Sequence, residues 1–151
     1  MNDEWVTIGY EQIPKEIFDK YGIKPFQIMK RKMRKADGTI WHNINYFDAL
    51  KECKKIGHRM FGVKEALVLL EAYKKQNKTV SIHDKKFLGI EELSYDEDVC
   101  FEWIEINKKL AFIRGGSWDN GASAGSFALY LLYAPSYSGA GIGFRCCRKR
   151  R

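Results

Sequence analysis

The chain has 151 residues, of which 45% are hydrophobic and 30% are charged, enough for one domain with a hydrophobic core. No segment reaches the roughly 20 apolar residues of a membrane helix, and the acidic start Met-Asn-Asp-Glu is unlike a secretory signal. The formal net charge of +7 raises nucleic acid as a partner, but the aromatic-rich part of the chain lacks the interleaved Lys and Arg of such sites. We therefore expect the basic runs at 30–35 and 148–151 to be a solvated surface and a frayed tail.

The first forty residues predict two strands, a short helix and a turn. Residues 5–8 alternate weakly, as a short strand does, and Pro14 and Gly22 suit the first turn and the end of a helix. A second strand is expected over 26–35. The turn sequence Ala-Asp-Gly-Thr at 36–39 then predicts a hairpin.

Two further helices are predicted by apolar residues spaced three and four apart. The first begins after Asn45, which suits an N-cap, and ends at Gly57. The second runs from about Val63 to Lys75. Its expected buried side consists of Ala66, Leu67, Leu69, Leu70 and Tyr73.

A β-hairpin follows in the second half of the chain. Residues 99–106 alternate as a strand does, and 110–113 return as its antiparallel partner. Glu102 and Glu105 flank Trp103, and we expect both carboxylates on the solvent face of this strand.

Two more short strands are predicted at 126–129 and 142–146. Residues 91–98 form an acidic run, which we interpret as a solvated loop; a structural calcium there is the alternative. No repeat or linker interrupts the chain, so one α+β domain over 1–151 is expected.

The four cysteines, Cys53, Cys100, Cys146 and Cys147, show no metal-binding pattern. They contain no Cys-x-x-Cys pair, and the three histidines have no metal-ligand spacing with them. Adjacent cysteines cannot bridge each other without strain. We expect free, mostly buried thiols, as in a reducing compartment, and neither a metal nor another cofactor.

Residues 113–147 have the composition of a recognition surface. Between Gly115 and Phe144 the only charged residue is Asp119, and the rest is mainly Gly, Ala, Ser, Leu and aromatic residues. Gly provides turns at little steric cost, and Tyr provides large, stiff, amphipathic contact area. Such a stretch suits ligand contact better than charged catalysis.

Motifs in this stretch resemble a known signature. Arg-Gly-Gly-Ser-Trp at 114–118, Phe-Ala-Leu at 127–129 and Ile-Gly-Phe-Arg-Cys at 142–146 are similar to the C-terminal part of two related groups. These groups are the formylglycine-generating enzymes and the variable proteins of diversity-generating retroelements. Both have a C-type-lectin-like fold, which implies two helices packed on short antiparallel strands with long loops. Residues 46–65 fit its helical part more loosely, and 1–39 match it poorly.

The missing thiols favour the variable proteins over the enzymes. Formylglycine-generating enzymes carry two copper-binding cysteines shortly after the Gly-Gly-Ser, whereas residues 119–125 here contain none. We therefore expect a protein that is not an enzyme. An enzyme homologue that has lost its catalytic cysteines is the alternative.

The resemblance implies which positions vary. In these retroelements a template repeat is copied with errors at adenines, usually in AAY codons, and overwrites the 3′ end of the gene. Every residue at the positions aligned with that pattern is reachable from AAY. The predicted variable, ligand-binding positions are Asp119, Asn120, Ser123, Tyr130, Leu132, Tyr133, Tyr137, Gly139 and Gly141.

The tyrosines predicted to vary are expected to be exposed, and the framework residues of the stretch are expected to be buried. Tyr130, Tyr133 and Tyr137 lie among Ser, Gly and Pro, and we expect them to be exposed; for Leu132 core and surface stay equally open, since it follows another Leu. The expected core residues of the stretch are Trp118, Phe127, Leu129 and Phe144.

The function that this resemblance implies is recognition of a protein or glycan on a host or neighbouring cell surface. The chain would act at the tip of a viral tail fibre or as a surface adhesin, and hence on a virion or a cell surface. The poorly matched residues 1–39 are a candidate docking surface for a fibre or anchor protein.

Overall fold

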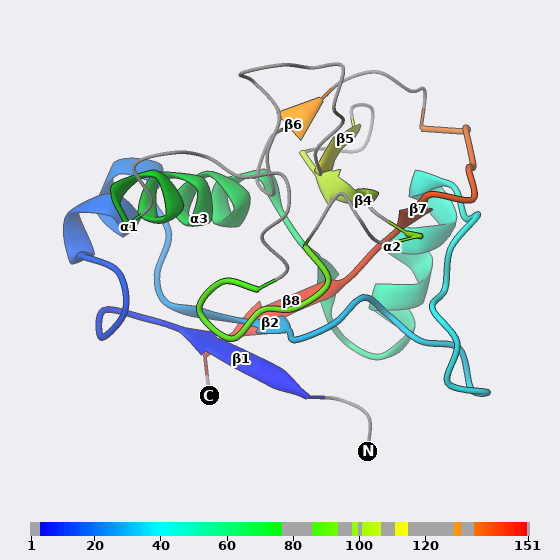
Figure 1. The fold of residues 1–151 in the computed structure, drawn as a ribbon, viewed down its shortest axis with the longest axis horizontal. Helices are drawn as coiled ribbons and strands as arrows, with labels where there is room; N and C mark the ends of the chain where they lie inside the picture. Colours follow the sequence, from blue (N-terminus) through cyan, green and yellow to red (C-terminus); the bar gives the residue numbers. More distant parts are fainter. Residues whose placement is uncertain are drawn as a thin grey trace.

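The structure, a computed structural model, describes residues 4–76, 86–93, 98–99, 101–106, 111–114, 129–130 and 135–150. In this part the fold is α+β, with three helices and two four-stranded sheets (Figure 1). The helices are α1 (Lys15–Tyr21), α2 (Tyr46–Lys55) and α3 (Val63–Gln76). The strands are β1 (Trp5–Ile8), β2 (Phe26–Met29), β3 (Arg59–Met60), β4 (Phe101–Glu105), β5 (Ala111–Arg114), β6 (Leu129–Tyr130), β7 (Ile142–Gly143) and β8 (Cys146–Lys149).

The first sheet has the order β1-β2-β8-β3, and each neighbouring pair is antiparallel. The C-terminal strand β8 therefore lies inside the sheet, between β2 and β3. Residues 1–39, which match the family motifs poorly, provide two of its four strands. They are thus joined to the closing motif at 142–146 by strand pairing.

The second sheet has the order β6-β5-β4-β7. β4 and β5 form the predicted hairpin, in register from Glu102 opposite Arg114 to Glu105 opposite Ala111. β7 pairs with β4 in parallel, and β6 pairs with β5 in antiparallel. This sheet thus carries the start of the 113–147 stretch, in β5, and part of its end, in β7, on either side of β4.

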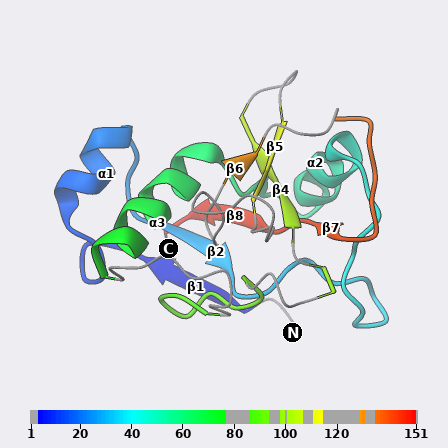
Figure 2. The ribbon, with the colours of Figure 1, turned by 45° about the horizontal axis from the view of Figure 1, so that its top comes forward.

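Two apolar clusters form the core. Helices α1 and α3 lie together at one end of the molecule, and α2 lies at the other (Figure 2). The cluster under α1 and α3 includes Ile8, Phe18, Phe26, Leu69 and Ile104. The cluster beside α2 includes Tyr46, Met60, Trp103, Phe144 and Cys146.

The residues predicted to begin α2 and to end α1 and α2 do so in the structure. The Asn45 side chain accepts a hydrogen bond of 2.8 Å from the Asp48 amide, and Gly57 ends that helical segment with φ of +80°. Gly22 stops α1 in the left-handed conformation. The buried side of α3 differs from the prediction, because Val68 and Ala72 are buried while Leu67 and Leu70 are half-buried.

Two predicted strands differ in their bounds from the observed ones. The strand over 26–35 ends at Met29, and the hairpin at 36–39 is a tight turn with a single bridge between Arg34 and Ile40. The strand over 142–146 is divided into β7 and β8 by Phe144 and Arg145. Residues 126–128 and the turn at 107–109 lie outside the described residues. Within the described ranges, no helix has the length and apolar character needed to cross a membrane.

Candidate functional site

The closing motif at 142–146 is built around Arg145, whose side chain is fully buried. Its guanidinium donates to both carboxylate oxygens of Glu102, from Nε at 2.7 Å and from Nη2 at 3.1 Å. It also donates to the backbone carbonyls of Met29 and Lys30, each at 3.1 Å, and of Glu91 at 2.9 Å. One side chain therefore joins β4, the end of β2 and the segment at 91–93.

The expectation that Glu102 and Glu105 face solvent is wrong. Glu102 is fully buried against Arg145, and Trp103 on the other face of β4 is fully buried as well, because both faces of this strand are covered. Glu105 is half-buried, and burial raises the pKa of its carboxyl group above the ordinary value. Of the two glutamates that flank Trp103, Glu102 thus belongs to the interior and Glu105 lies at its edge.

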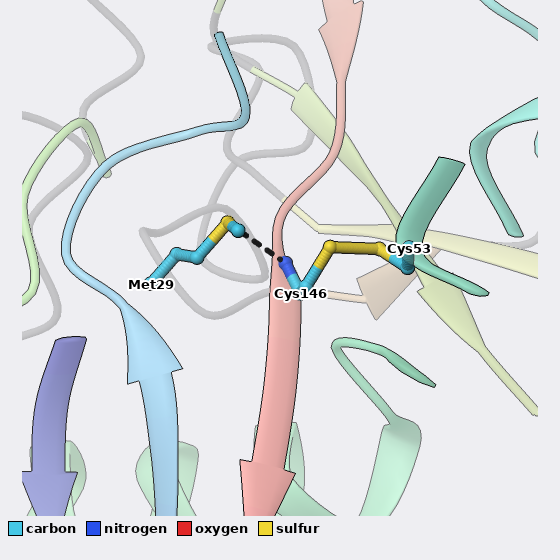
Figure 3. Close-up of a disulfide and its surroundings, with 3 residues drawn as sticks. All are labelled: Met29, Cys53 and Cys146. Atoms are coloured by element: carbon cyan, nitrogen blue, oxygen red, sulfur yellow. Dashed lines mark hydrogen bonds between the residues drawn. A yellow bond between two sulfur atoms is a disulfide. The ribbon is translucent and has the colours of Figure 1, made fainter. Parts of the chain in front are cut away.

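A disulfide between Cys53 and Cys146 joins α2 to β8, with a Cα–Cα distance of 5.7 Å (Figure 3). The Cys146 amide also donates to the Met29 sulfur at 3.4 Å. The expectation of four free thiols is therefore wrong, since the fold brings together two cysteines that are 93 residues apart. Cys147 is a buried free thiol, and burial raises its pKa well above the ordinary value. Cys100 lies outside the described residues.

The start of α2 packs on the second sheet through aromatic residues. The Trp103 indole donates to the Ile44 carbonyl at 2.8 Å, and the Tyr46 ring meets Trp103 edge to face with centroids 5.9 Å apart. Burial, followed by the charge of Glu105, raises the pKa of Tyr46 to about 12. The Tyr46 amide donates to the Pro135 carbonyl at 3.0 Å, which fastens the segment at 135–141 to this helix.

Backbone hydrogen bonds hold the segment at 135–141 at its other end too. The Ala140 carbonyl lies 2.8 Å from His42 Nδ1, and the Gly141 carbonyl accepts from the Phe101 amide at 2.9 Å. Between these anchors Tyr137 is 43% exposed. The backbone of the segment is therefore fixed by other elements, while the Tyr137 side chain faces solvent.

The glycines of this region differ in the space around them. Among the residues that the structure describes, a Cβ at Gly141 would meet only Phe101 Cδ2 at 4.0 Å, and one at Gly139 would meet the exposed ring of Tyr137 at 3.0 Å. A Cβ at Gly143 would lie 3.1 Å from Lys32 Cδ and 3.2 Å from the Trp41 carbonyl oxygen. Side chains thus fit at 141, fit at 139 if an exposed ring turns, and are crowded at 143.

This architecture is similar to solved structures. It matches the U1 variant of the Major Tropism Determinant with a TM-score of 0.50 and 12% identity, over 87% of this chain and 47% of that one. It matches the M1 variant with a TM-score of 0.50 and 13% identity, over 96% and 48%. The chain has a C-type-lectin-like fold. Major Tropism Determinant variants are variable proteins of diversity-generating retroelements, so the likeness confirms the fold that the sequence resemblance implies.

The C-type-lectin-like chain spans about half the length of these structures. No family model and no curated protein matches it.

Of the nine predicted variable positions, the structure brings Tyr137, Gly139 and Gly141 together in the segment at 135–141. The predicted exposure of Tyr137 and the predicted burial of Phe144 are confirmed. Tyr130 lies in β6 opposite Ile113. The remaining five, with the expected core residues Trp118 and Phe127, lie outside the described residues: Asp119, Asn120, Ser123, Leu132 and Tyr133.

The basic run at 30–35 is built into the fold, which corrects the expectation of a solvated patch. Lys32 is 2% exposed and its Nζ donates to the Glu92 carbonyl at 2.6 Å, while Arg34 pairs with the Glu92 carboxylate. Burial alone would raise the pKa of Glu92, but hydrogen bonds from Arg34 and the Lys32 amide outweigh it and hold that pKa below the ordinary value. Glu92, which belongs to the acidic run at 91–98, thus forms an ion pair with Arg34.

A surface pocket of about 640 Å³ adjoins the segment at 135–141. Ser138 lines it together with the loop at 41–45 and the exposed side of α2. Its charged lining is mixed, with Lys35, Lys51 and Lys55 beside Asp48 and Glu52. No group of three or more metal-ligating side chains occurs in the described ranges.

Proposed function

We propose that this chain is a ligand-recognition protein, with a variable surface displayed by residues 113–147 on a C-type-lectin-like scaffold. The observation that supports it is a division by burial within the described part of this stretch. Tyr137, predicted to vary, is exposed, whereas Phe144 and Arg145 of the closing motif are fully buried. A protein that changes specificity without losing its fold requires this division.

The surroundings of the glycines support the same division. Gly141, predicted to vary, has room for a side chain, and Gly143 of the closing motif has none. The hydrogen bonds at Pro135, Ala140 and Gly141 use backbone carbonyls, so exchanging side chains at these positions leaves these acceptors in place.

The ligand that we propose is a protein or glycan on a host or neighbouring cell surface. The name of the similar structures, Major Tropism Determinant, indicates that those proteins determine tropism, and we propose a comparable role for this chain on a virion or a cell surface. The predicted patch is poor in charge, with tyrosines as anchors; a few such buried aromatic contacts dominate many interfaces, at about 2 kcal/mol or more each. The adjoining pocket beside Ser138 offers polar contacts from residues that are not predicted to vary.

Sequencing the gene and its surroundings tests the retroelement part of the proposal. We expect a near copy of the codons for about 114–146, differences between the copies confined to adenines of the template, and a reverse transcriptase gene nearby. A near copy with differences spread over all four bases, or no copy at all, would contradict it.

A display library tests whether the predicted positions accept variation. All nine are randomised to the residues that AAY codons reach, and a matched library randomises the closing motif at 142–146. We expect most members of the first library to fold, as measured by protease resistance, and to yield binders against several unrelated protein targets. Equal loss of folding in both libraries, or a first library without any binders, would refute the proposal.

The enzyme alternative has no support from the described cysteines. Cys53 and Cys146 are joined to each other, and the raised pKa of buried Cys147 disfavours the thiolate that copper binding needs. Copper-dependent oxidation of a cysteine-containing peptide by the purified chain would revive this alternative.

A further inference from the structure

Two adjoining pockets, of about 440 and 790 Å³, form a groove at the C-terminal end of β8. They share Arg59, Lys149 and Arg150. The smaller pocket continues along the backbone at 57–59 and 147–150, and the larger one reaches the residues between α1 and β2. Neither is lined by a predicted variable position, so the groove is separate from the proposed ligand surface.

The groove is strongly basic. Its basic lining residues are Lys24, Arg59, Arg148, Lys149 and Arg150, and its one acidic lining residue is Glu65. The Glu65 side chain is 8% exposed and already pairs with Arg59 at 2.7 Å. Lys24 and Lys149 form no ion pair with any residue that the structure describes. Arg150 pairs with Glu11 at 3.0 Å. With Arg59 and Arg150 each paired to a glutamate, the excess positive charge of the groove comes mainly from Lys24 and Lys149.

The smaller pocket lies where the first sheet is incomplete. On one side β2 pairs with β8 as far as Lys149, but on the other side β3 pairs only with Cys146 and Cys147. The residues before β3 do not continue its line beside β8, because the His58 amide donates a hydrogen bond to the Cys53 carbonyl near the end of α2. No described strand lies beside Lys149 on the β3 side, so β8 has an open edge there.

We propose that this groove binds an extended acidic segment of a partner protein, which adds as a strand beside β8 in line with β3. Exposed strand edges accept added strands through main-chain hydrogen bonds, and side-chain pockets provide the specificity. The larger pocket has an apolar lining of Ile23, Pro25 and Phe26 within its basic rim. It suits an apolar side chain flanked by carboxylates.

The positive charge at this edge favours an acidic partner over a second copy of the chain. Lysine at a strand edge prevents pairing of identical edges, because like charges are brought together. An edge with Lys149, which pairs with no carboxylate that the structure describes, repels its own copy and attracts carboxylates. Gly141 and Lys149 are eight positions apart, at most about 25 Å of extended chain. Figure 1 shows the C-terminal end of β8 away from the segment at 135–141, so a ligand at one leaves the other open.

The test uses the full chain and a fluorescein-labelled nine-residue peptide of alternating glutamate and valine, with binding measured by fluorescence anisotropy. We expect binding that weakens as salt increases. The double variant Lys24→Glu/Lys149→Glu should bind about tenfold more weakly, since two exposed charge contacts are reversed. The control Lys74→Glu/Lys86→Glu has the same change in net charge at exposed residues outside the groove and should bind within about twofold of the native chain.

Two further measurements separate strand addition from simple charge attraction. A peptide of the same sequence that is N-methylated at every backbone amide keeps its side chains but loses all main-chain donors, so we expect it not to bind. Hydrogen exchange of the Lys149 amide, which faces the β3 side, should slow when the first peptide is bound. Equal binding of both peptides, equal binding by the two double variants, or displacement of the peptide by a tighter-binding DNA duplex or heparin would overturn the proposal. Dimerisation of the native chain through this edge would overturn it as well.

Discussion

The closing motif at 142–146 and the preceding segment at 135–141 are consecutive in the chain but use their side chains in opposite ways. In the first, Arg145 is fully buried and joins three parts of the molecule through its guanidinium. In the second, backbone groups hold the segment while Tyr137 is 43% exposed. The difference shows how one stretch can be both rigid and open to change: its shape depends on main-chain contacts and on a few buried side chains.

The largest effect is expected from breaking the buried pair between Glu102 and Arg145. Glu102→Gln leaves a buried guanidinium without its counter-charge, which should lower the free energy of unfolding by about 3 kcal/mol or more. Urea unfolding followed by tryptophan fluorescence measures this. As the control, Asp19→Asn removes one partner of an ion pair in which both side chains are more than half exposed, and should change little. Equal effects of the two substitutions would show that the Arg145 pair does not support the fold.

Removing the disulfide should have the next largest effect. Cys53→Ala/Cys146→Ala is expected to cost about 2 to 4 kcal/mol, because the unfolded chain regains the freedom that the cross-link removes. Cys147→Ala keeps the disulfide and should cost less. When the native sequence is unfolded in denaturant and alkylated without reduction, mass spectrometry should find Cys53 and Cys146 unmodified. Alkylation of either one before reduction would contradict the pairing.

Local signals made much of the fold predictable from sequence. Asn45 and Gly57 mark the ends of α2 because capping depends on residues within one turn, and strand alternation is visible in the hairpin of β4 and β5. The exposure of Tyr137 followed from its neighbours Pro, Ser and Gly.

Contacts between distant residues were not predictable. Glu102 and Arg145 are 43 residues apart, and a glutamate in an alternating strand resembles a solvent-facing residue until its partner is known. The same applies to Lys32, which looked like part of a solvated run, and to the two cysteines of the disulfide. The burial of a charge and the pairing of a thiol depend on a partner that only the fold brings to it.

Gly143 tests whether the closing motif tolerates a side chain as the preceding segment is expected to do. Gly143→Ala places a methyl group 3.1 to 3.2 Å from Lys32 Cδ, the Trp41 carbonyl oxygen and Val99 Cγ1. Overpacking of this kind should cost about 1 to 3 kcal/mol in urea unfolding. A stability unchanged from the native chain would mean that the closing motif tolerates variation as readily as the segment before it.

Glu92 gives a pH-dependent test of the buried basic run. Its pKa is held below the ordinary value of 4.5, so its contribution to stability is present above that pH and is lost as the pH falls through the lower, folded-state pKa. Glu92→Gln should therefore cost about 1 kcal/mol near pH 7. The difference from the native chain should shrink in thermal unfolding below pH 4. A difference that stays constant from pH 7 to pH 3 would exclude an ionic role.

The smallest effect is expected where the proposed function needs it, at the predicted variable positions. Gly141→Ser adds a side chain whose Cβ meets, among the residues that the structure describes, only Phe101 Cδ2 at 4.0 Å. Serine is reachable from an AAY codon, and the change should alter the free energy of unfolding by less than about 0.5 kcal/mol. Because the anchoring hydrogen bonds of this segment use carbonyls, they persist in the variant. If the change destabilised the chain as much as Gly143→Ala does, a side chain here would disturb the fold, and the position could not be free to vary for recognition.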